Sequence, residues 1–274
     1  MVVMKKVKIY TLYSGSSGNS CFVRVGDTAI LIDAGRNAKA LCAALNSIGE
    51  NIADIKAIFV THEHTDHISA LDVVGKKNSM PIYITRQSAQ KFSADSPLRA
   101  RVFERDVLFS ENVGELRVSS FPTSHDSLMS VGYRIEYVED DGIHSIGYAT
   151  DVGYVSDAVR KGLMGCEAVV LECNHDVDML MQGPYPREIK RRVASSKGHL
   201  SNEECAELSL ELVQNGTRAI MLAHISRENN EPEIAFDAVS NAISGFDVNL
   251  FVAEPFTPVE LVIPKKERNK ECLR

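Results

Sequence analysis

The sequence contains no long hydrophobic run, and this absence excludes one class of protein. No stretch approaches the about 18 consecutive apolar residues of a membrane-spanning helix, so we expect no membrane span. The first residues, MVVMKKVKIYTLY, lack the longer apolar region and the small-residue cleavage site of a secretory signal. We therefore expect a cytoplasmic protein.

Paired cysteines are also missing. The six cysteines, at positions 21, 42, 166, 173, 205 and 272, are scattered and form no CxxC motif. Reduced and mostly buried thiols are the favoured interpretation, and a disulfide framework is the alternative. No internal repeat and no linker rich in Pro, Gly or Ser interrupts the 274 residues. We expect a single domain over residues 1–264, followed by a charged, frayed tail at 265–274.

An excess of basic residues is lacking as well, since the net charge is −7. This balance argues against a surface that is coated by nucleic acid as a whole. One local basic segment exists at residues 186–199, PREIKRRVASSKGH, which we call the basic track. It carries Arg187, Lys190, Arg191, Arg192 and Lys197 against Glu188 alone. Taken alone, it is typical of a solvated helix face, and no aromatic cluster accompanies it that would stack on bases.

Hydrophobic periodicity predicts alternating strands and helices along the chain. Strands are expected at 7–13, 20–25, 28–33, 56–61, 80–85, 99–103, 106–109, 113–121, 131–138, 143–149, 167–172, 217–223, 247–252 and 258–263. Helices are expected at 37–48, 66–76, 86–93, 155–163, 175–181, 186–194, 201–214 and 231–244. Two β-rich layers with helices outside predict an α/β protein of the four-layer αββα sandwich type. The order of the strands does not follow from the sequence.

A histidine cluster follows the predicted strand at 56–61. Residues 59–69 read FVTHEHTDHIS, and they contain His62, His64, Asp66 and His67 just before a predicted helix. Imidazole and carboxylate groups are ligands of Zn²⁺ and similar cations. Four ligands are too many for one open hydrolytic site and too few for two, so we expect further ligands downstream.

Three downstream candidates each follow a predicted strand, namely His125, Asp151 and His224. Side chains at strand ends gather at one edge of a sheet in α/β folds. The set then divides between two ions: His62, His64 and His125 on one, and Asp66, His67 and His224 on the other. Asp151 lies between them, because a carboxylate can bridge ions about 3.5–4 Å apart.

This pattern, HxHxDH followed by a His, an Asp and a final His, resembles the metallo-β-lactamase fold superfamily of hydrolases over residues 8–260. The segment LIDAG, 31–35, stands where that family places an aspartate behind the metal ligands, here Asp33. The resemblance implies two divalent metal ions, Zn or Mn, with Fe as an alternative. Members that reduce oxygen or nitric oxide with iron have Glu where His64 stands, so hydrolysis is favoured.

Further polar stretches bear on the substrate. In YSGSSGNS, 13–20, the donors Ser16, Ser17 and Asn19 are placed to bind an anion, or they form only a tight turn. In LECNHD, 171–176, His175 orients a phosphate or caps a helix. In SKGHLSNEE, 196–204, His199 precedes a helix that Ser201 caps, where it donates a proton to a leaving oxygen or only packs.

Together with AHISRENN, 223–230, these stretches resemble the YycJ/WalJ-type (VicX-like) branch, bacterial proteins associated with 5′-to-3′ DNA exonuclease activity. The resemblance implies hydrolysis of phosphodiester bonds in nucleic acid, with DNA favoured, by attack of a metal-activated water. Asp66 is expected to accept or orient the proton of that water, and His199 to protonate the leaving oxygen. Asn174 and His175 are expected to hold the phosphate, and Arg227 and Asn229 to reach the rim.

In this context the basic track becomes a candidate binding face for the nucleic-acid backbone. Three alternatives stay open. One keeps the metals but changes the substrate to a small phosphodiester or RNA; another is a thioesterase or lactonase. The last is a metal-binding regulator without turnover, which the complete ligand set disfavours. Protein partners do not follow from the sequence.

Overall fold

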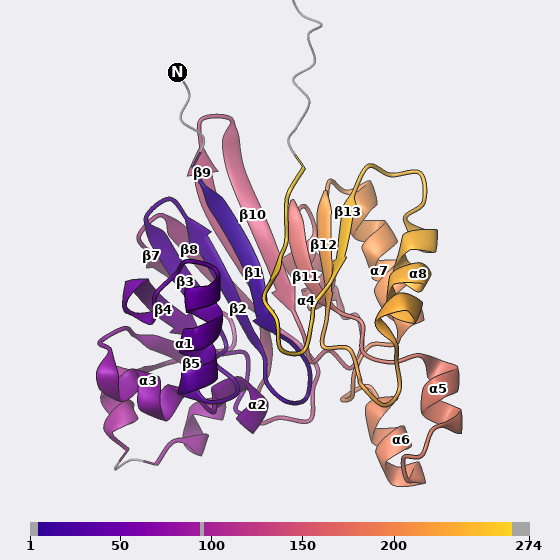
Figure 1. Cartoon of the computed structure of the whole chain (residues 1–274), viewed down its shortest axis with the longest axis horizontal. Coiled ribbons are helices and arrows are strands. Elements are labelled where there is room, and N and C mark those ends of the chain that lie inside the picture. The colour runs from indigo at the N-terminus through magenta and orange to yellow at the C-terminus, as the bar shows by residue number, and fades with distance from the viewer. Residues whose placement is uncertain (1–4, 94–95, 265–274) are drawn as a thin grey trace, which may run out of the picture.

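The computed structural model describes residues 5–93 and 96–264 of the chain. Two seven-stranded mixed sheets pack face to face, and helices cover the outer face of each (Figure 1). The predicted four-layer αββα sandwich is therefore confirmed. The predicted tail at 265–274 lies outside the described residues, and the single-domain assignment stays a prediction. Within the described ranges, no helix combines the length and hydrophobicity that crossing a bilayer requires.

The first sheet has the strand order β14-β1-β2-β3-β4-β5-β6. Neighbouring strands are antiparallel from β14 to β3 and parallel from β3 to β6. The strands are β1 (Val7–Tyr13), β2 (Ser20–Val25), β3 (Thr28–Ile32), β4 (Ile55–Phe59), β5 (Ile82–Thr85), β6 (Val102–Arg105) and β14 (Val259–Glu260).

The second sheet has the order β13-β12-β11-β10-β9-β8-β7. Strands β13 to β10 are parallel, and β10 to β7 are antiparallel. The strands are β7 (Ser110–Val113), β8 (Leu116–Pro122), β9 (Val131–Glu139), β10 (Gly142–Ala149), β11 (Ala168–Glu172), β12 (Ala219–Ala223) and β13 (Asn249–Val252).

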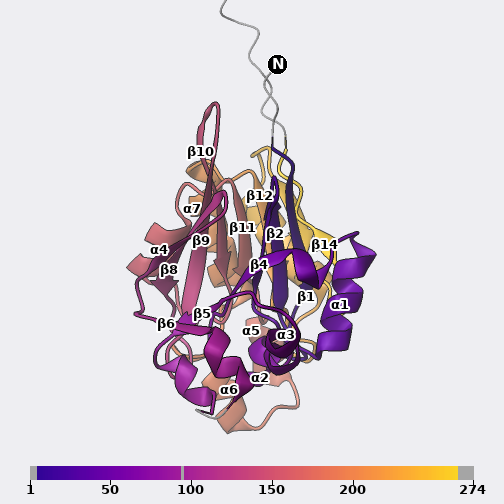
Figure 2. The same cartoon turned by 90° about the vertical axis from the view of Figure 1, so that its left-hand side faces the viewer.

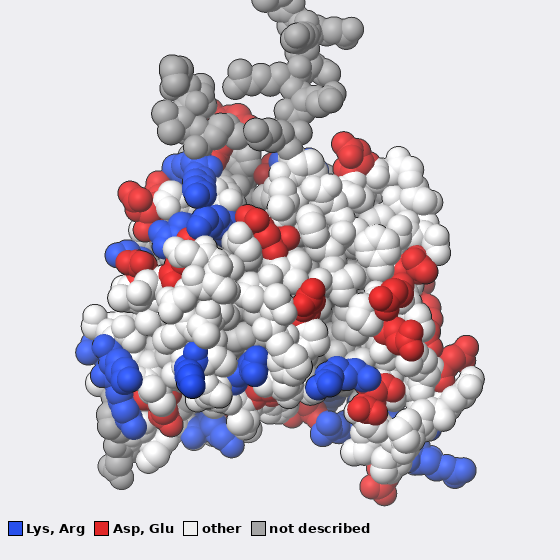
Figure 3. Space-filling view, viewed as in Figure 1, with Lys and Arg blue, Asp and Glu red and all other residues white. Residues whose placement is uncertain are grey.

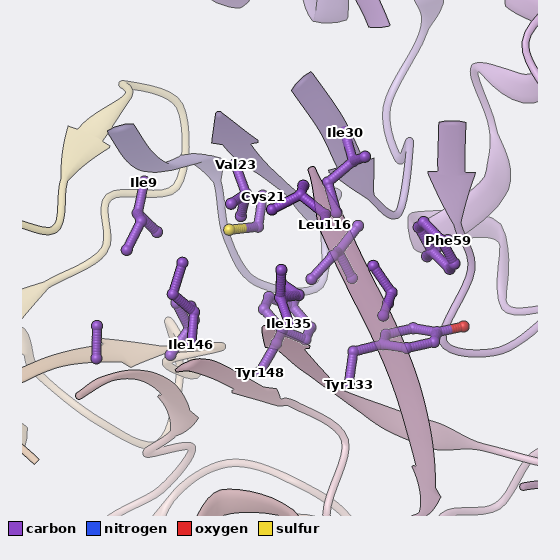
Figure 4. Packing of buried hydrophobic residues seen from close by; sticks show 14 of the residues in the cluster. Ile9, Cys21, Val23, Ile30, Phe59, Leu116, Tyr133, Ile135, Ile146 and Tyr148 are labelled. Atoms are coloured by element: carbon purple, nitrogen blue, oxygen red, sulfur yellow. The ribbon is translucent and has the colours of Figure 1, made fainter. Parts of the chain in front are cut away.

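Three apolar layers hold the sandwich together. Between the sheets, Ile30 and Phe59 of the first sheet face Tyr133 and Ile135 of the second (Figure 4). The alternate residues of the same strands point outward, so central strands such as β3 and β11 are buried on both faces and read as continuous apolar runs.

Helices close the two outer layers, and Figure 2 shows them on opposite sides of the paired sheets. Helices α1 (Ala38–Ser47) and α3 (Leu71–Lys77) cover the first sheet, and α4 (Asp157–Leu163), α7 (Asn202–Gln214) and α8 (Pro232–Ala242) cover the second. The remaining helices are the short α2 (Thr65–Ile68), α5 (Val177–Gln182) and α6 (Arg187–Val193). Single 3₁₀ turns span Ile52–Asp54, Ser88–Lys91 and Pro97–Arg101.

The helix expected at 66–76 is broken into α2 and α3. The carbonyl of Asp66 accepts from the N–H of Asn19 (2.8 Å), and the carbonyl of His67 accepts from the N–H of Ala34 (2.8 Å). The N–H of Ala70 in turn donates to the carbonyl of Ala34 (2.9 Å). Neighbouring loops therefore take the backbone groups that a continuous helix would pair internally.

The strand expected at 99–103 is shifted, and the strand expected at 106–109 was wrong. A 3₁₀ turn over Pro97–Arg101 covers the start of the first range, and its strand, β6, begins only at Val102. At the second, the hydroxyl of Ser120 accepts from the N–H of Phe109 (2.9 Å) and donates to the carbonyl of Val107 (2.8 Å). The Ser120 side chain therefore takes up backbone hydrogen-bonding groups that would otherwise pair with a neighbouring strand. As a result, β7 begins only at Ser110. The helix expected at 86–93 is a 3₁₀ turn, and the last strand covers Val259–Glu260 alone.

The carboxyl ends of strands from both sheets meet at one edge of the sandwich. Strands β3, β4, β8, β10, β11 and β12 end there, and α2 and α6 lie at the same edge in both views (Figures 1 and 2). The segments that follow these strands carry most of the polar side chains selected from the sequence.

Candidate metal centre

Three histidine rings lie together at this edge. His62 follows β4, His64 precedes α2, and His125 follows β8. The ring centroids of His62 and His64 are 4.5 Å apart, and that of His125 lies 5.0 Å from His62 and 5.1 Å from His64. One nitrogen from each ring lies within 4.8 Å of the other two. This is the spacing at which three imidazoles can share one cation.

A second group lies beside the first. Ligand atoms of Asp66, His67 and His224 also lie within 4.8 Å of one another. Asp151 stands between the groups, because its Oδ1 is 3.5 Å from Nε2 of His125 and 3.6 Å from Nε2 of His224. Its Oδ2 is 3.3 Å from Nε2 of His67. The structure thus brings the seven expected ligands together, with one carboxylate placed to bridge two cations.

Hydrogen bonds fix which nitrogen each ring presents. Nδ1 of His67 donates to Oδ2 of Asp33 (2.8 Å), and the backbone N–H and hydroxyl of Thr61 donate to the same carboxylate (2.8 Å each). The hydroxyl hydrogen of Thr61 is then already used, so its oxygen accepts from Nδ1 of His62 (3.0 Å). Both rings consequently keep the lone pair on Nε2.

The same logic applies to the other two buried rings. Nδ1 of His224 donates to Oε1 of Glu172 (2.9 Å), and Nδ1 of His125 donates to the carbonyl of Gly198 (3.1 Å). Carboxylates and carbonyls in this position orient histidine ligands and make them more basic. In its neutral form, each of these four rings therefore presents the lone pair of Nε2 to the centre of the cluster.

Several of these atoms are buried without a partner. Among the described residues, Nε2 of His62, Nε2 of His224 and Oδ2 of Asp151 accept or donate no hydrogen bond. Buried polar atoms in native proteins are normally satisfied, so orphaned atoms that converge on one place call for a ligand. Their chemistry, imidazole nitrogen and carboxylate oxygen, fits divalent cations.

The charge balance points the same way. Asp33, Asp66, Asp151 and Glu172 place four carboxylates in the cluster, three of them almost fully buried. Burial alone would raise the pKa of the Asp151 carboxyl, but His224 and His67 hold it below its usual value. Burial alone would lower the pKa of His224, yet Asp151 and Glu172 raise it to about 9. Without a metal, a second proton on His67 and His224 would balance these carboxylates, and a divalent cation would displace that proton from Nε2.

The backbone is held in unusual conformations at the same residues. Asp33, Asp151 and His224 have φ values of 60°, 57° and 56°, in the left-handed region that non-glycine residues rarely adopt. Gly35 packs so tightly that an added Cβ would lie 1.8 Å from the carbonyl oxygen of Asp66. Such strain persists where the surroundings over-determine the geometry, and it is typical of functional sites.

His199 lies at the solvent side of the cluster. Its Nδ1 is 2.8 Å from Oε1 of Glu172 and 3.8 Å from Oδ1 of Asp151, and 16% of its side chain is exposed. Asn174 is buried, and its amide donates to the carbonyl of His224 (2.8 Å), so it supports a candidate ligand. His175 is buried as well, and in the described part of the chain its Nδ1 has no partner.

The other expected substrate residues are divided by their exposure. Ser16 and Ser17 are exposed in the turn between β1 and β2, whereas Asn19 is buried. The amide of Asn19 lies 3.2 Å from Oδ2 of Asp66 and 3.1 Å from Nε2 of His67, so it contacts the cluster directly. Arg227 is exposed. Asn229 was expected at the rim but is 1% exposed, because its backbone pairs with Ser226 and Asp176 inside the loop.

The basic track runs along α6 to the cluster. Arg187, Arg191, Arg192 and Lys197 are exposed, and Lys190 donates to the carbonyl of Met181 (2.7 Å). Nη1 of Arg192 is 3.6 Å from Oδ2 of Asp126, the neighbour of His125, and Lys197 stands two residues before His199. In Figure 3, basic side chains are spread along the lower half of the face shown, whereas its right-hand side is mostly acidic.

Residues 28–225 match a family model described as "Beta-lactamase superfamily domain". The chain belongs to the metallo-β-lactamase superfamily. Among metallo-β-lactamase superfamily relatives, exodeoxyribonuclease YycJ of Bacillus anthracis is 36% identical, over 86% of this chain and 90% of that protein. Exodeoxyribonuclease WalJ of Streptococcus pneumoniae serotype 2 (strain D39) is 34% identical, over 89% of this chain and 91% of that protein.

Solved structures of metallo-β-lactamase fold proteins share the architecture. YhfI from Bacillus subtilis superimposes with a TM-score of 0.70 at 17% identity, covering 93% of this chain and 98% of that chain. The short form of human tRNase Z gives 0.63 at 17% identity, covering 94% and 100%. At this identity the likeness shows the metallo-β-lactamase fold and no more. With the His and Asp clusters, the family assignment indicates binding of divalent metal ions.

Two residues that support this metallo-β-lactamase superfamily site were not given a role from the sequence. Glu172 stands in the segment LECNHD, 171–176, but was assigned no role of its own, although it bonds to both His199 and His224. Thr61 connects Asp33 to His62. The position of Glu172 at the end of an apolar strand was the available signal, because an acidic residue there is buried and needs partners.

Proposed function

We propose that this protein is a metal-dependent hydrolase of phosphodiester bonds in nucleic acid, and that it degrades DNA from the 5′ end. The observation that carries the proposal is the pair of ligand groups joined by Asp151. This site occurs in a chain that is about one-third identical, over most of its length, to two exodeoxyribonucleases.

The proposed ligands are His62, His64 and His125 for one divalent cation and Asp66, His67 and His224 for the other, with Asp151 shared. Bound divalent cations stabilise negative charge on a phosphate and make a water molecule more acidic. Zn²⁺ and Mn²⁺ are the proposed metals, and Fe is the alternative, since an all-His/Asp set accepts each of them.

Two side chains are proposed to handle protons. The carboxyl of Asp66 has its pKa held well below the usual value, because contacts with His67 outweigh the effect of burial. It therefore stays ionised and can accept a hydrogen bond from the attacking water. His199 is held by Glu172 through Nδ1, which leaves Nε2 free to protonate the leaving oxygen.

The substrate is proposed to approach along the basic track. Its exposed arginines lie at the edge that carries the cluster, where they can pair with backbone phosphates. His175, Ser16 and Ser17 are further proposed contacts for phosphate. DNA is favoured over RNA on the strength of the two relatives' names.

One assay tests the proposal. Purified protein is loaded with Mn²⁺ or Zn²⁺ and incubated with end-labelled single- and double-stranded DNA and RNA, beside bis(p-nitrophenyl) phosphate and a thioester. We expect mononucleotides to be released from DNA carrying a 5′ phosphate, and Asp66→Ala to abolish the release. Asp157→Ala, an exposed carboxylate on α4, is the matched control and should retain the activity.

Other outcomes assign the protein differently. Turnover of bis(p-nitrophenyl) phosphate without any polynucleotide cleavage would indicate a small phosphodiester as the substrate. Cleavage of RNA alone would support the same hydrolytic reaction but identify RNA, not DNA, as the substrate. Thioester hydrolysis without phosphodiester hydrolysis would overturn the proposal.

A further inference from the structure

Phe256 is a half-exposed aromatic side chain beside the candidate metal centre. It lies on the loop between β13 and β14, and 50% of its surface is accessible to solvent. In Figure 1 this loop turns back toward the lower part of the sandwich, close to the turn between β1 and β2. A half-exposed phenylalanine contributes little to the stability of the fold. The contacts of its side chain therefore bear on its role.

Two arginines contact the ring. The guanidinium carbon of Arg36 is 4.7 Å from the centroid of Phe256, and that of Arg227 is 5.6 Å from it. Each arginine comes from a loop of the candidate metal centre, since Arg36 follows Asp33 by three residues and Arg227 follows His224 by three residues. Phe256 therefore contacts side chains from two loops that also carry residues of the candidate metal centre.

Arg36 is rigidly placed. Its φ is 55°, and its backbone packs so closely that a Cβ on Gly18 would lie 2.8 Å from its N atom. The guanidinium also lies 5.6 Å from the ring centroid of Tyr13, whose hydroxyl donates to the carbonyl of Gly35 (2.7 Å). The guanidinium of Arg36 thus contacts both the buried ring of Tyr13 and the half-exposed ring of Phe256.

The two arginines have no acidic partner in the described part of the protein. Within residues 5–93 and 96–264, neither guanidinium forms an ion pair or a side-chain hydrogen bond. Two unpaired cations and an accessible aromatic ring at the rim of a phosphodiesterase-type site suit a nucleotide, which has a flat base and a phosphate.

We propose that Phe256, together with Arg36 and Arg227, forms a platform that binds one nucleotide of the substrate next to the bond to be cleaved. The base stacks against the accessible side of Phe256, and the guanidinium groups pair with the adjoining phosphates. Stacking on an aromatic ring tolerates every base, because each base has a π-face. Such a platform suits an enzyme that must process any sequence. The inference rests on the proposed function.

The absence of tryptophan from the chain permits a direct test. Phe256→Trp creates a single fluorescent reporter at the platform. The metal-loaded variant is titrated with a short phosphorothioate-linked single-stranded oligonucleotide, and in parallel with an abasic oligomer of equal length and charge. We expect saturable quenching of the fluorescence by the oligonucleotide and at least several-fold less quenching by the abasic oligomer, because only a base can stack on the indole.

Phe103→Trp is the matched control. Phe103 is 44% exposed and lies 5.8 Å from the guanidinium carbon of Arg105, but it belongs to β6 at the far edge of the first sheet. Its fluorescence should not respond to either oligomer. Equal quenching of both reporters, equal quenching by both oligomers, or no quenching at Phe256→Trp would overturn the inference.

A kinetic comparison supplies a second readout. Phe256→Ala is expected to raise KM for single-stranded DNA about 10-fold, a typical loss for one stacked base, with a smaller change in kcat. Phe103→Ala should behave as wild type. An unchanged KM in Phe256→Ala contradicts the inference. If wild type cleaves no nucleic acid, the proposed function fails whatever the fluorescence shows, so the two failures are distinguishable.

Discussion

Oε1 of Glu172 lies 2.8 Å from Nδ1 of His199. The same oxygen is 2.9 Å from Nδ1 of His224, so one carboxylate connects the proposed proton donor to a candidate metal ligand. Glu172 is fully buried, and burial alone would raise the pKa of its carboxyl. His199 and His224 lower that pKa well below the usual value, which keeps the carboxylate charged.

Replacing Glu172 tests this connection. Glu172→Gln keeps the shape but removes the charge that orients both imidazoles, and such changes behind metal ligands typically cost about 10–100-fold in metal affinity or activity. We expect losses in both, measured by chelator competition and by nuclease rate, together with an altered pH profile of kcat. Glu211→Gln, a half-exposed partner of Arg160, is the control. Wild-type values in Glu172→Gln would contradict the assigned role.

Removal of metal should lower thermal stability. The cluster holds several buried carboxylates whose repulsion a cation relieves, and a ligand that binds only the folded state stabilises it. We expect dialysis against a chelator to lower Tm by about 5–10 °C, with recovery on addition of Zn²⁺ or Mn²⁺. Elemental analysis should find metal in the wild type and less in Asp151→Ala, whose Tm should respond weakly to the chelator. An equal response in both proteins would argue against Asp151 as a ligand.

The basic track predicts a salt-dependent affinity for DNA. Reversing the charge at Arg191 and Arg192 (Arg191→Glu with Arg192→Glu) should weaken binding and reduce the slope of log K against log salt by about 1 for each lost phosphate contact. The measurement is fluorescence anisotropy at several salt concentrations. Lys56→Glu with Arg117→Glu is the charge-matched control, because both residues are exposed near the amino ends of β4 and β8, away from the cluster. If the slope of log K against log salt is equal for the two double variants, the basic track is not part of the DNA-binding surface.

His144 predicts a pH-dependent contribution to stability that is independent of metal. Burial alone would lower the pKa of His144, but hydrogen bonds to Glu167 (2.9 Å) and Asp141 (2.7 Å) raise it above its usual value. A raised folded-state pKa stabilises the protein fully below the unfolded pKa of about 6.5, and the effect is lost as pH rises through the folded pKa.

His144→Gln should therefore lower Tm more at about pH 5.5 than at about pH 9.5. Lys161→Gln, an exposed cation on α4, should show no such pH dependence. A wild-type to His144→Gln difference that is the same at both pH values would refute the prediction.

Much of the cluster was predictable because its residues carry their chemistry in their spacing. His62, His64, Asp66 and His67 stand in one motif, and His125, Asp151 and His224 each follow an apolar strand. Apolar runs such as those of β11 and β12 identify buried strands whose carboxyl ends meet at one edge. The layered fold followed from the same alternation of strands and helices.

The remainder depends on contacts between residues far apart in the chain. The role of Glu172 requires His199 and His224, which are 27 and 52 residues away, to reach the same oxygen. The break between α2 and α3 depends on Asn19 and Ala34, whose backbone groups replace helical bonds. Local propensity contains no information on either arrangement, so the continuous helix was expected and Glu172 received no role.

The division of the ligands between the two sheets has a consequence for synthesis of the protein. His62 to His67 follow β4 of the first sheet, whereas His125, Asp151 and His224 follow strands of the second. A ribosome completes the first group well before it reaches His224, so an unfinished chain lacks a full set of candidate ligands. Hydrolase activity would then arise only in finished molecules in which the two sheets have packed together.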